Sequence, residues 1–155
     1  MATFDEKLET AHQALARGDS ASAERILAHL LRSAPRHSRA NELMAYVSRS
    51  RGDVEGSLRL LETATASPDA SATAWYYLGD GYFRHRRLEE AANAFRRGLD
   101  VRAEFFEALH ELGRVLHEQG RYPDATAAYE RAIAINGQSF EALHNAGKSL
   151  WAAGR

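Results

Sequence analysis

The chain has 155 residues, and its 20 lysines and arginines against 21 acidic residues give a formal net charge of −1. A near-neutral chain lacks the basic surplus on which nucleic-acid and anionic-membrane binders depend, so neither kind of partner is expected. The absence of cysteine excludes disulfides, thiolate metal sites and cysteine nucleophiles.

The distribution of apolar residues predicts a cytoplasmic protein. Charged residues stand among the first seven positions, where a secretory signal would be apolar, and no stretch reaches the ~18 apolar residues of a membrane helix. Alanine, the strongest helix former, occurs 29 times, whereas proline occurs three times. An all-α chain follows from this composition.

Short breaks in the helical pattern recur at a spacing of 34 residues or twice that. Glycines stand at four places in this frame, and Arg86 occupies the remaining one; the glycines are Gly18, Gly52, Gly120 and Gly154. Four alanines share a second frame of the same period, namely Ala40, Ala74, Ala108 and Ala142. A fixed period of this length indicates a repeat array, in which each unit packs only on its neighbours.

Each unit is predicted to form two helices, and the pattern of apolar residues is clearest in the segment 106–139. Its first helix carries one apolar stripe at helical spacing, formed by Leu109, Leu112, Gly113 and Leu116. Gly120 ends that helix, since glycine tolerates a left-handed conformation, and Pro123 stands near the start of the next helix. In the second helix we expect Tyr129 to fill the space between units.

These residues resemble the tetratricopeptide repeat family. The resemblance divides a single domain, 1–155, into repeats 4–37, 38–71, 72–105 and 106–139, followed by 140–153 as the first helix of a fifth repeat or a capping helix. It implies a right-handed superhelical solenoid of antiparallel helix pairs, with the first helices lining a concave groove. The first repeat lacks the family signature and looks like a degenerate cap, and Asn41 and Ser48 replace apolar residues in the second.

The sequence contains no phosphate-binding loop and no assembled set of catalytic residues, so we expect neither an enzyme nor a cofactor. His110 and His144 occupy equivalent places on neighbouring helices and are the one pair that a metal ion could join. Solvated groove histidines are the favoured interpretation, and no metal site is predicted. The basic run 84–87 lies at a turn, where cations favour the helix C-terminus.

Helical rotation predicts which side chains face the groove, opposite the core stripe. They are Tyr46, Arg49, Tyr76, Asp80, Phe83, Arg84, His110, Arg114, His117, His144 and Lys148. For Tyr76 and Phe83, packing and partner binding are equally good explanations. The lysine–asparagine clamp of chaperone-binding family members is absent, because Leu8 and His12 stand at its positions.

The predicted function is a non-enzymatic scaffold that binds a peptide or partner protein in the groove. The alternative is the N-terminal arm of a larger bacterial transferase, because similar repeats precede sulfotransferase and glycosyltransferase domains. In that case the arm would dock substrate or assist dimerisation. The fifth unit, with its first helix and no second one, motivates this alternative, and it also suggests self-association through the C-terminal edge.

Overall fold

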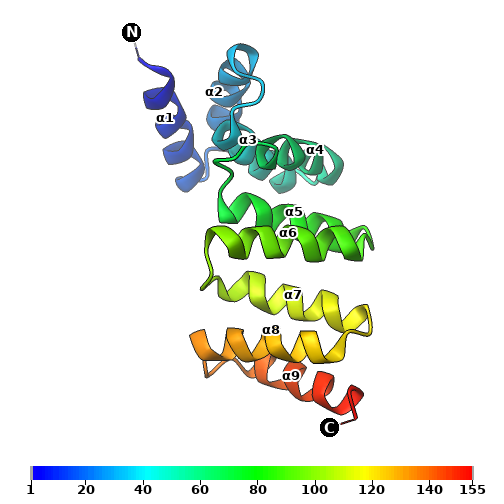
Figure 1. Cartoon of the computed structure of the whole chain (residues 1–155). Helices are drawn as coiled ribbons and strands as arrows, with labels where there is room; N and C mark the ends of the chain where they lie inside the picture. Colours follow the sequence, from blue (N-terminus) through cyan, green and yellow to red (C-terminus); the bar gives the residue numbers. More distant parts are fainter. Residues whose placement is uncertain (1, 155) are drawn as a thin grey trace. The chain divides into compact units, whose positions relative to one another are not determined.

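The computed structural model describes residues 2–154, and this range forms nine α-helices and no strand (Figure 1). The all-α fold class predicted from the sequence is confirmed. The first helices of the pairs are α1 (Phe4–Ala16), α3 (Ser38–Ser50), α5 (Ala72–Arg84), α7 (Phe106–Glu118) and α9 (Phe140–Ala152). The second helices are α2 (Ser20–Ser33), α4 (Val54–Thr65), α6 (Leu88–Val101) and α8 (Tyr122–Ile135). None of these helices is long and apolar enough to cross a bilayer.

The turn after each of the first helices has the left-handed geometry that the glycine spacing predicts. Gly120 has φ +74°, its N–H donates to His117 O over 3.0 Å, and the N–H of Arg121 donates to Leu116 O over 2.9 Å. Arg86 holds the same turn with φ +60°, the only positive φ of a non-glycine among the described residues. The backbone geometry of this turn therefore persists where the glycine is missing.

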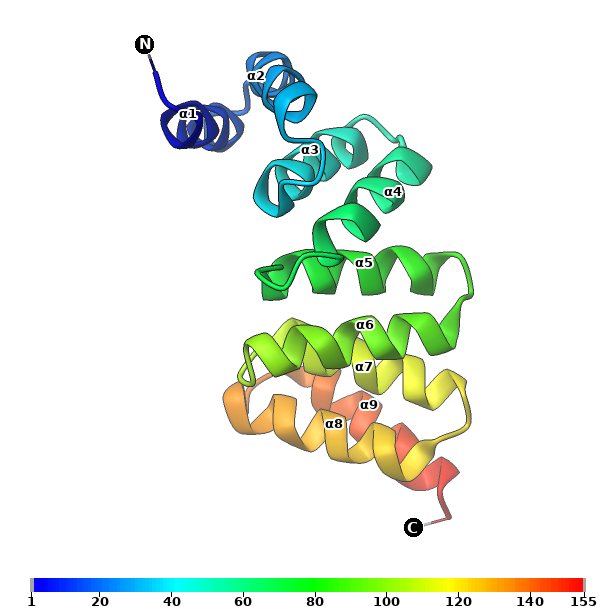
Figure 2. The same ribbon diagram turned by 45° about the horizontal axis from the view of Figure 1, so that its top comes forward.

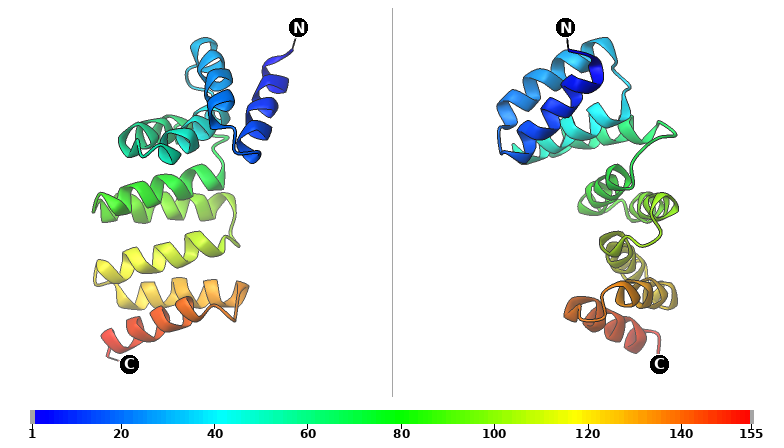
Figure 3. Two further views of the ribbon diagram at one scale, coloured as in Figure 1. Left: turned by 180° about the vertical axis from the view of Figure 1, so that it is seen from behind. Right: turned by 90° about the vertical axis from the view of Figure 1, so that its left-hand side faces the viewer.

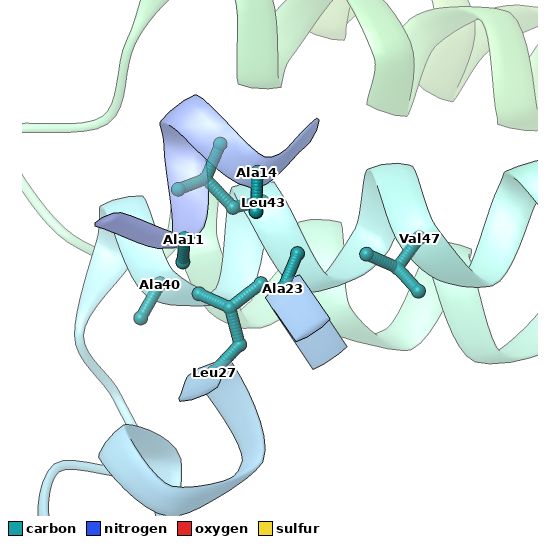
Figure 4. Close-up of a cluster of buried hydrophobic side chains, with 7 residues drawn as sticks. All are labelled: Ala11, Ala14, Ala23, Leu27, Ala40, Leu43 and Val47. Carbon is teal, nitrogen blue, oxygen red and sulfur yellow. The ribbon is translucent and has the colours of Figure 1, made fainter. Parts of the chain in front are cut away.

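The chain divides into two compact units, residues 1–74 and 75–155. In the first unit, α1 packs on α2, α2 on α3, and α3 on α4 (Figure 2). Small and branched apolar side chains of α1, α2 and α3 form one core cluster (Figure 4): Ala11, Ala14, Ala23, Leu27, Ala40, Leu43 and Val47. The alanines let the three helices approach closely, because their side chains take little space.

Polar side chains close the ends of helices in this unit. Thr3 and Glu6 form a reciprocal capping box at the start of α1. Asn41, which replaces an apolar residue of the family pattern, is 3% exposed and donates its amide N–H groups to Pro35 O and His37 O over 2.9 and 3.0 Å. This buried asparagine is satisfied by the loop between α2 and α3, which explains why a polar residue is tolerated here.

In the second unit, α8 packs against both α7 and α9, and α6 packs against α7 (Figure 3). Two aromatic rings of second helices lie against glycines of first helices. A Cβ atom on Gly79 would stand 2.8 Å from the Phe95 ring, and one on Gly113 would stand 2.6 Å from the Tyr129 ring. The glycines are therefore required by close packing. Tyr129 was expected between units, and the structure places its ring against Gly113 of the same repeat.

The same repeat position is open in α9. A Cβ atom on Gly147 would meet nothing within 4 Å. Ala142, Ala146 and Ser149 are buried, whereas Leu143 is 47% and Trp151 is 84% exposed. One face of α9 thus packs on the unit, and a face with large apolar side chains stays exposed.

The left-handed turn yields a first prediction. Arg86→Gly should raise the free energy of unfolding by about 0.5–1 kcal/mol, because it relieves the φ +60° conformation at the cost of some unfolded-state entropy. Gly120→Ala should lower it by about 1 kcal/mol for the opposite reason. Urea denaturation measures both, and Glu118→Gln controls for the ion pair that Arg86 also makes. If Arg86→Gly lowered the free energy of unfolding by more than Glu118→Gln does, Arg86 would not be strained in this turn.

Alanine substitutions at the equivalent glycines of α7 and α9 should change the free energy of unfolding in opposite directions. Gly113→Ala should destabilise by about 1–3 kcal/mol, because the new methyl group overlaps the Tyr129 ring. Gly147→Ala should stabilise by about 0.8–1 kcal/mol, since the site is open and alanine is the better helix former. Thermal and urea unfolding of the two variants test this, and a shift of the same sign in both would refute it.

Candidate functional site

A pocket of about 230 Å³ lies on the second unit between side chains of α7, α8 and α9. We call it the α7–α9 pocket; it is lined by Arg114, His117, Glu118, Tyr129, Asn145 and Lys148. Three of these residues, Arg114, His117 and Lys148, were predicted to face a groove, and the structure brings them together. Larger hollows of the first unit, such as the one of about 690 Å³ between α1 and α2, contain none of the predicted site residues.

A chain of polar contacts joins the pocket to the core of the unit. Arg114 Nη1 donates to both carboxylate oxygens of Glu111 over 2.8 and 3.0 Å. His110 Nδ1 lies 3.4 Å from Glu111 Oε1, and its Nε2 lies 3.2 Å from the Asn145 amide nitrogen. With the proton of His110 on Nδ1, Nε2 accepts from Asn145, so every link has a donor and an acceptor.

Glu111 is the charged centre of this chain, with a side chain only 15% exposed. Its burial by itself would raise the pKa of Glu111, but the hydrogen bond from His110 and the charge of Arg114 outweigh this effect and hold that pKa below its usual range. Glu111 therefore stays ionised near neutral pH and keeps the Arg114 guanidinium in place over the Phe83 ring, 5.1 Å from the ring centroid.

Tyr129 enters the pocket from α8. Its ring packs against Gly113 and lies 5.7 Å from the His110 ring, and the residue is 1% exposed. Burial raises the pKa of Tyr129 above its usual range, so the phenol is neutral at physiological pH. Within residues 2–154, its hydroxyl group makes no hydrogen bond, although it lines the pocket.

The remaining walls combine a fixed histidine, a paired carboxylate and an exposed ammonium group. His117 Nδ1 lies 2.8 Å from Ser149 Oγ, and the His117 ring meets the Tyr122 ring edge-on at 5.1 Å. Glu118 is paired with Arg86. Lys148 is exposed and has no carboxylate partner in the described part of the chain. Lys148 thus brings a positive charge to the pocket wall, and the carboxylate of Glu141 acts on Arg114 and Tyr129 from the same helix, α9.

On α5, the predicted site residues continue the polar and aromatic surface of the second unit. Arg84 Nε donates to Asp80 over 2.9 Å. Tyr76 is half-buried, with its ring 5.9 Å from that of Phe95 and 5.3 Å from that of Phe105. Burial raises the pKa of Tyr76 to about 12. Tyr76 therefore contributes to packing, while Phe83 lies beneath the Arg114 guanidinium.

The other predicted site residues lie apart from the pocket. Tyr46 is 45% exposed on α3 of the first unit, and the Arg49 guanidinium stands 5.8 Å from the centre of its ring. His144 is exposed on α9 and stacks on Phe140, with 5.9 Å between the ring centroids. The role of these residues in partner binding stays a prediction.

The interpretation of His110 as a solvated groove histidine is wrong. The residue is 6% exposed, because its ring is held between Phe106 at 6.1 Å and Tyr129, and both of its nitrogens face polar partners. Its Nε2 atom faces Asn145. The described residues contain no group of three or more metal-ligating side chains.

The basic run at the α5–α6 turn is balanced by carboxylates. Arg84 pairs with Asp80, Arg86 with Glu118, and Arg87 Nε donates to Glu90 over 2.8 Å. Alternating pairs of this kind give a surface of mixed sign. Such a surface differs from the continuous basic stripe that tracks a nucleic-acid backbone.

Sequence reasoning missed Glu111, Tyr129 and Asn145 as site residues. A signal for Tyr129 was present, because the equivalent residue of the preceding repeat is Phe95, and the hydroxyl group is the difference between the two. The i, i+3 spacing of Glu111 and Arg114 was a signal for their ion pair, whereas the contact of Asn145 with His110 depends on how α9 packs on α7.

Comparisons with known proteins identify the same repeat. The family model described as "Tetratricopeptide repeat" matches residues 8–71, 43–92 and 78–140. No curated protein matches the chain.

Solved structures share the fold at low sequence identity. The MamA protein superposes with a TM-score of 0.84 at 21% identity, covering 97% of this chain and 82% of MamA. YrrB, described as a TPR protein with an unusual peptide-binding site, has a TM-score of 0.86 at 15% identity, with coverages of 96% and 77%. PilF of Pseudomonas aeruginosa has a TM-score of 0.78 at 19% identity, with coverages of 96% and 68%.

The ionised state of Glu111 predicts a pH-dependent stability difference. A carboxyl group with a lowered pKa in the folded state contributes stability above its unfolded pKa of about 4.3, and this contribution is lost as pH falls through the folded pKa. Glu111→Gln should therefore cost about 1 kcal/mol at pH 7 and progressively less below pH 4.

Urea unfolding of wild type and variant at pH 7, 5, 4 and 3 measures this difference. Glu107→Gln, an exposed change on the same helix, is the control and should stay within about 0.5 kcal/mol of wild type at pH 7. A Glu111→Gln cost that does not depend on pH would contradict the assignment.

Proposed function

The chain belongs to the tetratricopeptide repeat family, and we propose that it is a non-enzymatic protein-interaction module that holds an extended or helical peptide along the first helices α5, α7 and α9. The observation that carries this proposal is the set of polar and aromatic side chains on α5, α7 and α9, of which Arg114 and Lys148 line the α7–α9 pocket. Arg84, Arg114 and Lys148 contribute cations, Asp80 and Glu111 contribute carboxylates, and Phe83 adds an apolar contact.

This mixture of groups suits a peptide better than a small apolar ligand. A peptide in a groove presents carbonyl and amide groups together with charged side chains, and complementary charges give specificity more than raw affinity. The aromatic and arginine content also matches the residues that contribute most to binding energy at interfaces. The peptide-binding site named for YrrB, a protein of the same fold, is consistent with such a role.

The exposed face of α9 supports a second proposal, self-association through the C-terminal edge. Phe140 is 79% exposed and Trp151 84%, next to the open position at Gly147. The same face could equally receive further residues of a larger bacterial transferase, so the alternative of an N-terminal arm is kept as a proposal. The cytoplasmic location also stays a prediction.

Peptides selected from a display library with the wild-type chain test the interaction proposal. The double variant Arg84→Gln and Arg114→Gln should bind the selected peptides at least tenfold more weakly, because it removes two cations from the proposed binding face. Its melting temperature should change little, since both arginines are substantially exposed and exposed ion pairs contribute only about 0–1 kcal/mol.

The matched control is the double variant Arg97→Gln and Arg131→Gln, which removes the same charge from the second helices α6 and α8. It should bind within twofold of wild type. The proposed binding face would be refuted if both double variants lost peptide affinity equally. It would also be refuted if neither double variant changed the affinity for the selected peptides.

Self-association has its own test. Sedimentation velocity of the wild-type chain at increasing concentration should show dimers, and Leu143→Gln with Trp151→Gln should abolish them, because burial of large apolar side chains drives association. A concentration-independent monomer would rule the proposal out.

A further inference from the structure

The exposed face of α9 lacks a contact that the equivalent helices of the second unit make. Gly79 of α5 lies against the Phe95 ring and Gly113 of α7 against the Tyr129 ring, so that a Cβ atom on either glycine would stand 2.8 Å or less from the ring. Gly147 follows Gly113 by one repeat, and a Cβ atom there would meet nothing within 4 Å. α9 therefore presents an open position where its counterparts hold an aromatic ring of a neighbouring helix.

The same face of α9 carries a large exposed aromatic ring. Trp151 is 84% exposed and stands four residues after Gly147, which places the two residues one above the other on the helix surface. Phe140, which is 79% exposed, and Leu143, which is 47% exposed, continue this face toward the start of α9 at helical spacing. One helix face thus offers both a ring and a position that lacks one.

Such a face is complementary to itself. In a pair of copies related by a two-fold axis, each contact between two residues is repeated with their roles exchanged. If the two α9 helices run antiparallel with the axis level with Gly147, Trp151 of each copy stands opposite Leu143 of the other, because both residues lie four positions from Gly147. Helical side chains lean toward the N-terminus of their helix, so each Trp151 ring reaches back over the partner's Gly147. The missing side chain of Gly147 lets the helices approach until the ring fills the space.

Charge does not oppose this pairing. The chain has a formal net charge of −1, so two copies repel one another only weakly. Glu141 and Lys148 lie along one edge of the exposed face, and Glu141 also acts on Arg114 of α7. In the antiparallel pair this edge carries both lysines between both carboxylates, so attraction offsets repulsion. Burial of apolar side chains, and not charge, therefore has to drive the association.

The apolar area of this face fits a weak, reversible dimer. An aromatic side chain buries about 150–250 Å², so covering the exposed part of Trp151 in both copies removes roughly 250–400 Å² from water. Leu143 and the near edge of Phe140 add to this area. Stable interfaces bury about 1,200–2,000 Å² in total, and smaller ones belong to transient complexes. The contact therefore forms at high protein concentration and dissociates on dilution.

We propose that two copies of the chain pair through antiparallel α9 helices, with each Trp151 ring against Gly147 and Leu143 of the partner subunit. This inference rests on the proposed self-association and names the contact that forms the dimer. A second copy is the occupant because one helix face supplies both the ring and the open position. The contact repeats between copies what the rings of Phe95 and Tyr129 do within the chain.

Gly147→Leu separates this contact from unspecific association. Its side chain occupies the place of the ring, so sedimentation velocity should show a dimer at least about tenfold weaker than that of the wild type. Unspecific apolar association would instead increase, because leucine enlarges the exposed apolar face. Gly147→Leu should also raise the melting temperature of the monomer, since leucine is the better helix former and the position is open. Val101→Ala, at a 56% exposed position of α6, is the control and should leave association unchanged.

An engineered disulfide tests the register, because the chain contains no cysteine. Packed helices stand about 8–10 Å apart with Cα atoms about 2.3 Å from each axis, so the two Gly147 Cα atoms come within roughly 5 Å. A disulfide spans about 4.4–6.8 Å between Cα atoms. Gly147→Cys should therefore cross-link under mild oxidation, and Trp151→Ala in the same chain should slow this reaction at least about tenfold. Glu141→Cys, whose copies stand about 18 Å apart along the helices, should not cross-link.

Unchanged or tighter association of Gly147→Leu would overturn the inference, as would cross-linking of Glu141→Cys at the rate of Gly147→Cys. If such a result accompanies dimers that Leu143→Gln with Trp151→Gln abolishes, self-association stands and only this contact is wrong. A monomer at every concentration overturns both proposals and leaves the α9 face to a helix of another protein. Peptide binding by the second unit is measured separately, and neither result changes its outcome.

Discussion

The contact between a glycine of a first helix and an aromatic ring of the following second helix determines the second unit. Phe95 occupies the space beside Gly79, and Tyr129 occupies the space beside Gly113. A methyl group at either glycine would overlap the ring, so the helices approach as closely as they do only because a side chain is missing. In α9 the corresponding Gly147 has no ring against it, and there a large apolar face stays exposed.

This packing also determines where the polar groups of the candidate site lie. A tyrosine that fills the interhelical space carries its ring into the core and leaves its hydroxyl group at the rim. The hydroxyl group of Tyr129 reaches the α7–α9 pocket for this reason, whereas Phe95 brings no polar group. The polar contacts of Glu111, His110 and Asn145 then join α7 to α9 beside it, so residues that hold the helices together also border the pocket.

The turns show how far a repeat can depart from its pattern before the backbone changes. Arg86 adopts the left-handed conformation of the glycines at equivalent positions and preserves both backbone hydrogen bonds of the turn. The cost of a non-glycine residue there is about 1–2 kcal/mol, small enough for the packing of α5 on α6 to impose the turn. Tertiary contacts therefore maintain the register of the repeat across a substitution that local propensity disfavours.

The sequence by itself determined the all-α class, the glycine turns and the core role of Tyr129, because these depend on spacing along one chain and on the conformational freedom of glycine. It also placed Arg114, His117 and Lys148 on the surface that forms the pocket, since helical rotation fixes their side. Only the tertiary structure decided that His110 is buried, that Tyr76 contributes to packing, and that Glu111, Tyr129 and Asn145 belong to the site. Distances between neighbouring helices set the burial of His110, the packing of Tyr76 and the places of Tyr129 and Asn145, whereas the pairing of Glu111 with Arg114 follows from their spacing within α7.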